Sequence, residues 1–183
     1  MEQKLMDAAL EEMRIHAMKF TMEDLTRRLH ISKTSLYKMV PSKDALIRGI
    51  VDSKIGVFRK NVAAILAGGA SADEKLLRLM HLYTDAFGIM GSHIAGDLQS
   101  LYPEIWQEWQ AFQRETIRTV MDLIRDGIAA GIYRPVHLFA SEACLTAAIA
   151  AVSSPAFLRQ SGMPYRDAVE AVGDLFLYGL KKR

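Results

Sequence analysis

Apolar positions recur along most of the chain with the spacing of an amphipathic helix. Near the N-terminus, Met6, Leu10, Met13 and Ala17 repeat at intervals of three and four residues, which predicts a helix over residues 2–17. The same period predicts further helices over 22–29, 33–39, 43–66, 72–90, 103–131, 136–153 and 164–181, with a short segment at 97–102. Because no convincing strand pattern occurs, we expect an all-α fold of about nine helices.

Local signals mark where these helices begin and end. The five prolines fall at the edges of the predicted segments. Thr21 opens the sequence Thr-Met-Glu-Asp, which is similar to a capping box, and Ser32 is a good N-cap for the next helix. Gly68-Gly69-Ala70-Ser71 predicts a break, and residues 91–96 predict a loop or kink around His93.

Composition narrows the class of protein. Half of the 183 residues are hydrophobic and the formal net charge is only +2, which excludes a disordered chain. A single cysteine, Cys144, excludes a disulfide framework and favours a reducing compartment. The N-terminus lacks the apolar core of a signal peptide, and the uncharged run at 143–158 is too short and interrupted to span a bilayer. We therefore expect a cytoplasmic protein without a membrane partner.

Charge is unevenly distributed along the chain. Residues 1–60 carry twelve basic and eight acidic side chains, whereas residues 61–183 carry a slight acidic excess. The stretch from Leu25 to Lys43 contains no acid, and its cations are Arg27, Arg28, Lys33, Lys38 and Lys43. Such a patch suits contacts with phosphates, although most charge runs are simply solvated surfaces.

Helices over 22–29 and 33–39, joined by His30-Ile31-Ser32, have the dimensions of a helix-turn-helix. The second helix would enter the major groove of DNA by its N-terminal residues. The side chains expected to pack it against the first helix of the chain are Leu25, Leu29, Ile31, Leu36 and Val40. Those left pointing outward are Lys33, Thr34, Ser35, Tyr37 and Lys38.

Residues 20–46 resemble the DNA-binding domain of the TetR/AcrR family of repressors. The matching or conservatively replaced positions are Ile31, Ser32, Ser35, Leu36, Tyr37, Ser42, Lys43, Asp44 and Leu46. The sequence departs from the family pattern at His30 and Thr34, where glycine is common, and at Met39 and Val40, where aromatic residues are frequent. The resemblance implies a DNA-binding domain over 1–47 and a helical ligand-binding and dimerisation domain over 48–183.

Roles in binding double-stranded DNA follow from side-chain chemistry. Thr34 and Ser35 are expected near base edges, and Lys33 at a base or a phosphate. The side chains expected at phosphates are Thr21, Tyr37, Lys38 and Lys43. Helix capping is an equally good interpretation for Thr21, Ser32 and Ser42, and Tyr37 could instead pack into the core.

The second region contains aromatic, methionine and polar side chains of the kinds that line ligand pockets. The candidates for binding an unknown small-molecule effector are Tyr83, Phe87, Met90, His93, Trp106, Trp109 and Phe112. The alternative for each is a filled hydrophobic core, or for His93 a solvated loop.

The last two helices suggest a homodimer, as the resemblance also implies. One predicted face carries Ala140, Cys144, Ala147, Ala148, Ala151 and Val152, and the other Val169, Val172, Phe176 and Leu180. Burial of both faces against their own domain is the alternative.

The sequence therefore indicates a ligand-responsive repressor that binds a palindromic operator, with no cofactor. His81 and Asp85 could share a metal ion, but no further ligand set accompanies them. No catalytic motif stands out, so we do not expect an enzyme. Two alternatives stay open: a regulator controlled by a partner protein instead of a ligand, and an all-α metal-dependent enzyme.

Overall fold

The computed structural model describes residues 3–88 and 92–181, except for the side chains of residues 92, 93, 95 and 155. The described part is all-α, which confirms the predicted fold class. Its helices are α1 (Gln3–His16), α2 (Met22–Leu29), α3 (Lys33–Met39), α4 (Lys43–Ala67), α5 (Ala72–Phe87), α6 (Ser92–Leu101), α7 (Pro103–Ala129), α8 (Leu138–Val152), α9 (Pro155–Ser161) and α10 (Tyr165–Leu180). A short 3₁₀ turn, Ala17–Lys19, follows α1. No helix within the described ranges is long and apolar enough to cross a membrane.

Two helices differ from the prediction. Residues 92–101 form α6, although the sequence predicted a loop or kink over residues 91–96, of which residue 91 lies outside the described residues. Ile94 and Leu98 are almost fully buried, and their burial outweighs the helix-breaking tendency of Gly96. The sequence pattern also did not predict α9, which Ser154 caps by accepting a hydrogen bond from the Phe157 amide at 3.2 Å.

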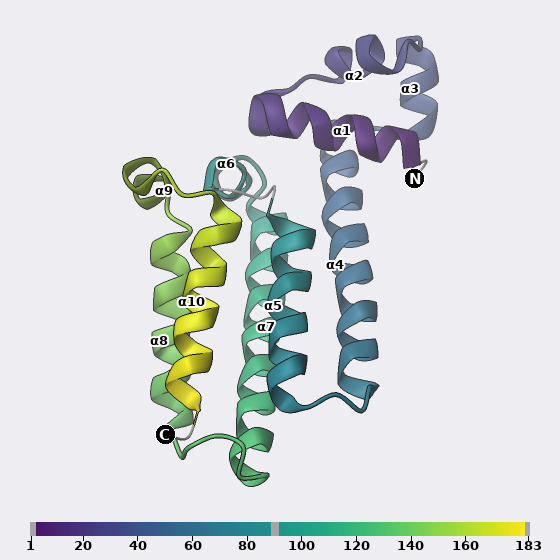
Figure 1. Cartoon of the computed structure of the whole chain (residues 1–183). Coiled ribbons are helices and arrows are strands. Elements are labelled where there is room, and N and C mark those ends of the chain that lie inside the picture. Colours follow the sequence, from purple (N-terminus) through teal and green to yellow (C-terminus); the bar gives the residue numbers. More distant parts are fainter. Residues whose placement is uncertain (1–2, 89–91, 182–183) are drawn as a thin grey trace. The chain divides into compact units, whose positions relative to one another are not determined.

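The chain divides into two compact units. The first unit contains the residues up to Gly56 and His93–Trp109, so it joins α1, α2, α3 and α6 to the first parts of α4 and α7. In Figure 1, α1, α2 and α3 lie together. The side chains that form its core include Leu5, Met13, Met18, Phe20, Leu25, Leu36, Leu46 and Ile47, all nearly inaccessible to solvent. The predicted boundary at residue 47 marks the end of the sequence motif and stays a prediction.

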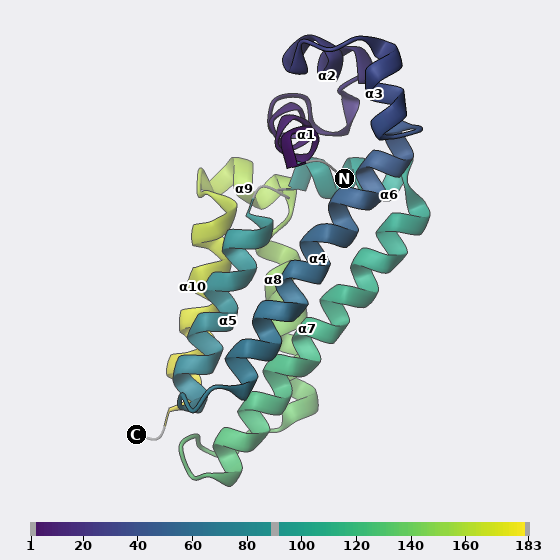
Figure 2. The ribbon, with the colours of Figure 1, turned by 90° about the vertical axis from the view of Figure 1, so that its right-hand side faces the viewer.

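The second unit contains Val57–Ser92 and the residues from Gln110 onward. In it α10 packs against both α5 and α8 (Figure 2). Two glycines allow close packing: a Cβ on Gly173 would overlap Met80, and one on Gly127 would overlap the buried Tyr133 ring. After α7 the chain returns to the end of α10, where the Arg134 amide donates to the Leu180 carbonyl at 2.9 Å.

Candidate functional site

Helices α2 and α3 are each capped by hydrogen bonds between residues that are close together in the sequence. Thr21 Oγ1 accepts from the Asp24 amide at 3.2 Å, and Asp24 Oδ2 accepts from the Thr21 amide at 2.8 Å. The Thr21 hydroxyl also donates to Asp24 Oδ2, at 2.7 Å, and the hydrogen bonds from the Thr21 hydroxyl and amide to this carboxylate lower the pKa of Asp24. At the other end of α2, His30 has a φ of 53°, a left-handed conformation that side chains rarely adopt. Ser32 then caps α3 by accepting from the Ser35 amide at 3.0 Å.

Helix α3 buries Leu36, half-buries Met39 and presents its other side chains to solvent. Leu36 has no exposed surface, whereas the predicted outward set is exposed, namely Lys33, Thr34, Ser35, Tyr37 and Lys38. Half of the Tyr37 surface is accessible, so Tyr37 is not a core residue of the single chain. Ser35 Oγ lies 2.9 Å from Ser32 Oγ. The exposed face of α3 is therefore polar and cationic along its whole length.

Most cations of the basic stretch are paired with acids from α1 and from the first turn of α2. The pairs are Arg27 with Asp24 (3.4 Å), Arg28 with Glu12 (2.6 Å) and Lys33 with Glu23 (3.2 Å). Glu12 is buried, so Arg28 is fixed, whereas both members of the Lys33 pair are mostly exposed. Lys38 has no ion-pair partner among residues 3–88 and 92–181. Its ammonium is thus the one on α3 that is free to donate to an added anion.

Lys43 is directed into the first unit. Its ammonium lies 2.5 Å from the Met18 carbonyl and 4.5 Å from the centre of the Phe20 ring. The Met18 amide donates to Asp97 Oδ2 of α6 at 3.2 Å. Burial lowers the pKa of Lys43, although nearby Asp44 and Asp97 oppose this shift. Lys43 therefore anchors the turn after α1, and its expected contact with a phosphate would compete with that role.

Three of the predicted ligand-binding residues lie in one cluster. Tyr83, Phe87 and Phe112 form an aromatic cluster with Phe58 in the second unit. Adjacent ring centres are 5.2–6.0 Å apart, so these rings contact one another directly. The sequence pattern did not single out Phe58 as a ligand-binding candidate.

The other predicted ligand-binding residues are the two tryptophans, Met90 and His93. Trp106 and Trp109 belong to the first unit, with Trp109 buried and Trp106 partly buried. Met90 and the side chain of His93 fall outside the described residues.

A group of uncharged polar side chains adjoins the aromatic cluster. Gln113 Nε2 lies 3.5 Å from the Tyr83 hydroxyl, and the Tyr83 and Tyr165 hydroxyls are close enough that each shifts the pKa of the other. Burial raises the pKa of both tyrosines. Ser153 Oγ is buried near Tyr165 without satisfying hydrogen-bond geometry. We call Tyr83, Gln113, Ser153 and Tyr165 the inner polar group. Sequence reasoning had no signal for the last three, because they come from separate helices and from a helix end.

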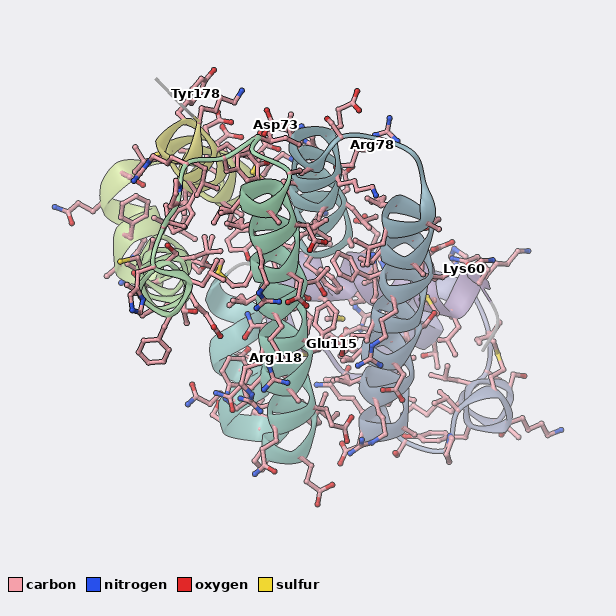
Figure 3. All side chains as sticks on the ribbon, turned by 90° about the horizontal axis from the view of Figure 1, so that it is seen from below. Lys60, Asp73, Arg78, Glu115, Arg118 and Tyr178 are labelled. Atoms are coloured by element: carbon pink, nitrogen blue, oxygen red, sulfur yellow. The ribbon has the colours of Figure 1, made fainter. Side chains whose placement is uncertain are left out.

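An apolar face of α8 and α10 is exposed in the single chain. Phe139, Leu175 and Tyr178 each expose at least three quarters of their surface. Figure 3 shows Tyr178 projecting away from the neighbouring helices. The predicted stripe on α10 was partly wrong, because Val169, Val172 and Leu180 are buried within the chain. On α8 the predicted residues Ala140, Cys144, Ala147 and Ala151 are exposed.

The described residues contain no group of three or more histidine, cysteine, aspartate or glutamate side chains that could hold a metal ion. The candidate pair has other partners, since His81 Nδ1 lies 3.6 Å from Glu170 and Asp85 pairs with Arg166.

Comparison with known proteins supports the fold. A TetR-family transcriptional regulator from Thermus thermophilus matches with a TM-score of 0.70 at 19% identity, covering 99% of this chain and 100% of that chain. A ketosteroid transcriptional regulator of Mycobacterium tuberculosis matches with a TM-score of 0.72 at 16% identity, covering 98% and 94%.

A transcriptional regulator from Saccharomonospora viridis, solved in complex with choline, matches with a TM-score of 0.79 at 17% identity, covering 99% and 97%. Neither a protein-family model nor a curated protein matches the chain. The chain has the fold of the TetR-family transcriptional regulators, as the motif in residues 20–46 predicts.

Proposed function

We propose that this protein is a DNA-binding transcriptional regulator that represses its target by occupying a palindromic operator as a homodimer, and that a small molecule releases it. One observation carries the proposal. Helix α3 belongs to a capped helix-turn-helix, in which it buries Leu36 and leaves five polar or basic side chains exposed. A helix placed in this way can insert into the major groove, where side chains reach base edges and phosphates.

The side chains proposed to contact DNA differ in their chemistry and in whether a partner within the chain already engages them. Thr34 and Ser35 are near the N-terminus of α3, where recognition helices contact bases. Lys38 is unpaired among the described residues and suits a phosphate. Lys33 can exchange its exposed pair with Glu23 for DNA, because exposed ion pairs contribute at most about 1 kcal/mol. The Thr21 hydroxyl already belongs to the capping box, so its helix amides are the better phosphate donors.

The exposed face of α8 and α10 supports a second copy of the chain as its partner. Phe139, Leu175 and Tyr178 offer large apolar surfaces, and the exposed alanines of α8 allow two helices to approach closely. The two helices pack against each other, so the face is continuous. A two-fold dimer pairs such a face with itself and presents two recognition helices to the two halves of a palindrome.

The dimer is tested by light scattering on the full chain. Leu175→Arg places a charge in the centre of the face, and we expect it to shift the protein to monomer. Val57→Arg is the matched control, because Val57 is also an exposed aliphatic residue of the second unit but lies outside this face. A wild-type monomer, or a dimer unaffected by Leu175→Arg, would refute the proposed interface.

DNA binding is tested by selecting operators from a random-sequence DNA pool with the wild-type protein. We expect the selected sites to share an inverted repeat with half-sites about one helical turn apart. Thr34→Ala should change the selected bases within each half-site, because a side chain at a base edge specifies sequence. Selection of no shared sequence at low salt would refute the proposed function.

The direct packing of Phe58, Phe87 and Phe112 favours one alternative, a regulator that takes no ligand and responds to a partner protein. These rings fill the space between them, so a small molecule would have to bind beside them. Operator binding that no small molecule alters would favour this alternative.

A further inference from the structure

The acids that pair with the basic stretch in the described part of the chain differ in how firmly they are held. Glu12 is buried, and its Oε1 accepts a hydrogen bond from Arg28 Nε at 2.6 Å. Asp24 accepts hydrogen bonds from the Thr21 amide and hydroxyl in the capping box. Glu23 is different, because 64% of its side chain is exposed and it belongs neither to the core nor to the cap. Glu23 is therefore the acid of this set that can contact a molecule outside the chain.

The Glu23 carboxylate lies beside the N-terminus of the recognition helix. Lys33 is the first residue of α3, and its ammonium lies 3.2 Å from Glu23 Oε1. Thr34, which is expected at a base edge, directly follows Lys33 in the chain. A recognition helix contacts bases with its N-terminal residues, so docking of α3 brings this carboxylate to the major groove as well.

A carboxylate at this place is unfavourable next to most of the DNA surface. Duplex DNA carries one negative charge about every 1.7 Å along its axis. When Lys33 exchanges its ion pair for DNA, the Glu23 carboxylate loses this cation beside the polyanion. The donors that the bases offer in the major groove to replace it are the exocyclic amino groups, cytosine N4 and adenine N6. Glu23 is therefore compatible with some base sequences and is repelled by the others.

We propose that Glu23 determines operator specificity by accepting a hydrogen bond from the N4 amino group of a cytosine in each half-site. This inference rests on the proposed DNA-binding function and assigns a base contact to a residue outside α3. Cytosine is favoured over adenine, because adenine presents its N7 acceptor beside the amino group and this acceptor repels a carboxylate. On unrelated DNA no cytosine amino group is in register, so Glu23 weakens non-specific binding more than operator binding.

The first test compares the affinities for two duplexes, the operator selected by the wild-type protein and an unrelated sequence, by fluorescence anisotropy on the full chain. Glu23→Gln removes the charge and keeps the shape. We expect the affinity for unrelated DNA to rise about three- to tenfold, and its salt slope to steepen by about 1.8, because each protomer of the dimer gains one net positive charge. Operator affinity should not rise, so the ratio of operator to unrelated affinity should fall at least about threefold.

Glu11→Gln is the matched control for this change of charge. Glu11 is an exposed acid of α1 that pairs with Arg14 at 3.1 Å, three residues along the same helix. Its replacement removes the same charge from the first unit and should leave the affinity ratio unchanged. Melting temperatures verify that both variants fold. An unchanged ratio in Glu23→Gln, or an equal change in Glu11→Gln, would overturn the proposal.

The second test repeats the operator selection with Glu23→Gln. A glutamine amide both donates and accepts, which matches the N7 and N6 groups of adenine, whereas a carboxylate matches cytosine N4. We expect one cytosine position in each half-site of the wild-type operator to change to adenine, and Glu11→Gln to select the wild-type operator. The same base preferences in the wild type and in Glu23→Gln would overturn the assigned contact.

Failure of this inference is separable from failure of the proposed function. The wild-type selection is carried out first and does not depend on Glu23 being correctly assigned. If the wild type selects an inverted repeat and Glu23→Gln behaves like the wild type, the Glu23 contact is wrong and the DNA-binding function stands. If the wild type selects no shared sequence, the proposed function itself fails.

Discussion

Lys38→Ala offers a quantitative test of how the protein contacts DNA. Lys38 lies on the exposed face of α3 and has no ion-pair partner among the described residues, so its removal breaks no ion pair among them. Each neutralised phosphate contributes about 0.9 to the slope of log affinity against log salt concentration. A dimer loses two such contacts, and the slope should therefore become shallower by about 1.8.

The assay is fluorescence anisotropy of labelled operator at several salt concentrations. Between about 50 and about 200 mM salt, the affinity deficit of Lys38→Ala should shrink about tenfold, and the loss should be similar for specific and unrelated DNA. Lys60→Ala is the matched control: this exposed lysine of the second unit, labelled in Figure 3, should leave the slope unchanged. An unchanged slope for Lys38→Ala would remove Lys38 from the interface and refute the docking of α3 proposed above.

Three further predictions concern stability and are measured by chemical denaturation. Gly127→Ala should lower the free energy of unfolding by about 1–2 kcal/mol, because the new methyl group displaces the buried Tyr133 ring. Gly56→Ala, where a Cβ meets open space, should raise the free energy of unfolding by about 0.5–1 kcal/mol. Equal effects of Gly127→Ala and Gly56→Ala would contradict the close packing of Gly127 on Tyr133. Thr21→Ala should lower the free energy of unfolding by about 1 kcal/mol, and Thr21→Ser should change it little. If the Thr21 hydroxyl contacted only DNA and did not cap α2, Thr21→Ala would leave the free energy of unfolding unchanged. Stability should also fall above about pH 10, because the unfolded chain then loses tyrosine protons that the folded chain keeps, and a constant stability up to pH ~11 would exclude this effect. The tyrosines with a pKa raised by burial are Tyr83, Tyr102, Tyr133 and Tyr165.

The DNA-reading motif could be predicted closely because its determinants are local. Thr21 and Asp24 are three residues apart and close their capping box whatever the rest of the chain does. Ser32 caps α3 in the same way, and the period of three to four residues places Leu36 inward. Local spacing of this kind also explains why most helix boundaries agree with the structure to within a few residues.

Features that depend on distant contacts could not be predicted. The α10 stripe of Val169, Val172 and Leu180 has the same period whether it faces a partner or α5, and only the packing of α10 on α5 decides which. That packing turns Leu175 and Tyr178 outward instead. Helix α6 likewise forms through the burial of Ile94 and Leu98, which local propensity around Gly96 cannot reveal.

By itself the sequence determined the all-α fold, the helix-turn-helix and the outward residues of α3, because capping and periodicity act over a few residues. Only the tertiary structure decided which of the basic side chains are engaged within the chain and which are left to bind a phosphate. Arg28 is held by Glu12 from α1, and Lys43 by the Met18 carbonyl, whereas Lys38 keeps an unpaired ammonium within the described part of the chain. The inner polar group arises in the same way, since Tyr83, Gln113 and Tyr165 are brought together only when α5, α7 and α10 pack. Ion pairs and polar contacts between helices form only between side chains that the packing brings close together. A pattern over a few neighbouring residues does not determine which helices pack against each other.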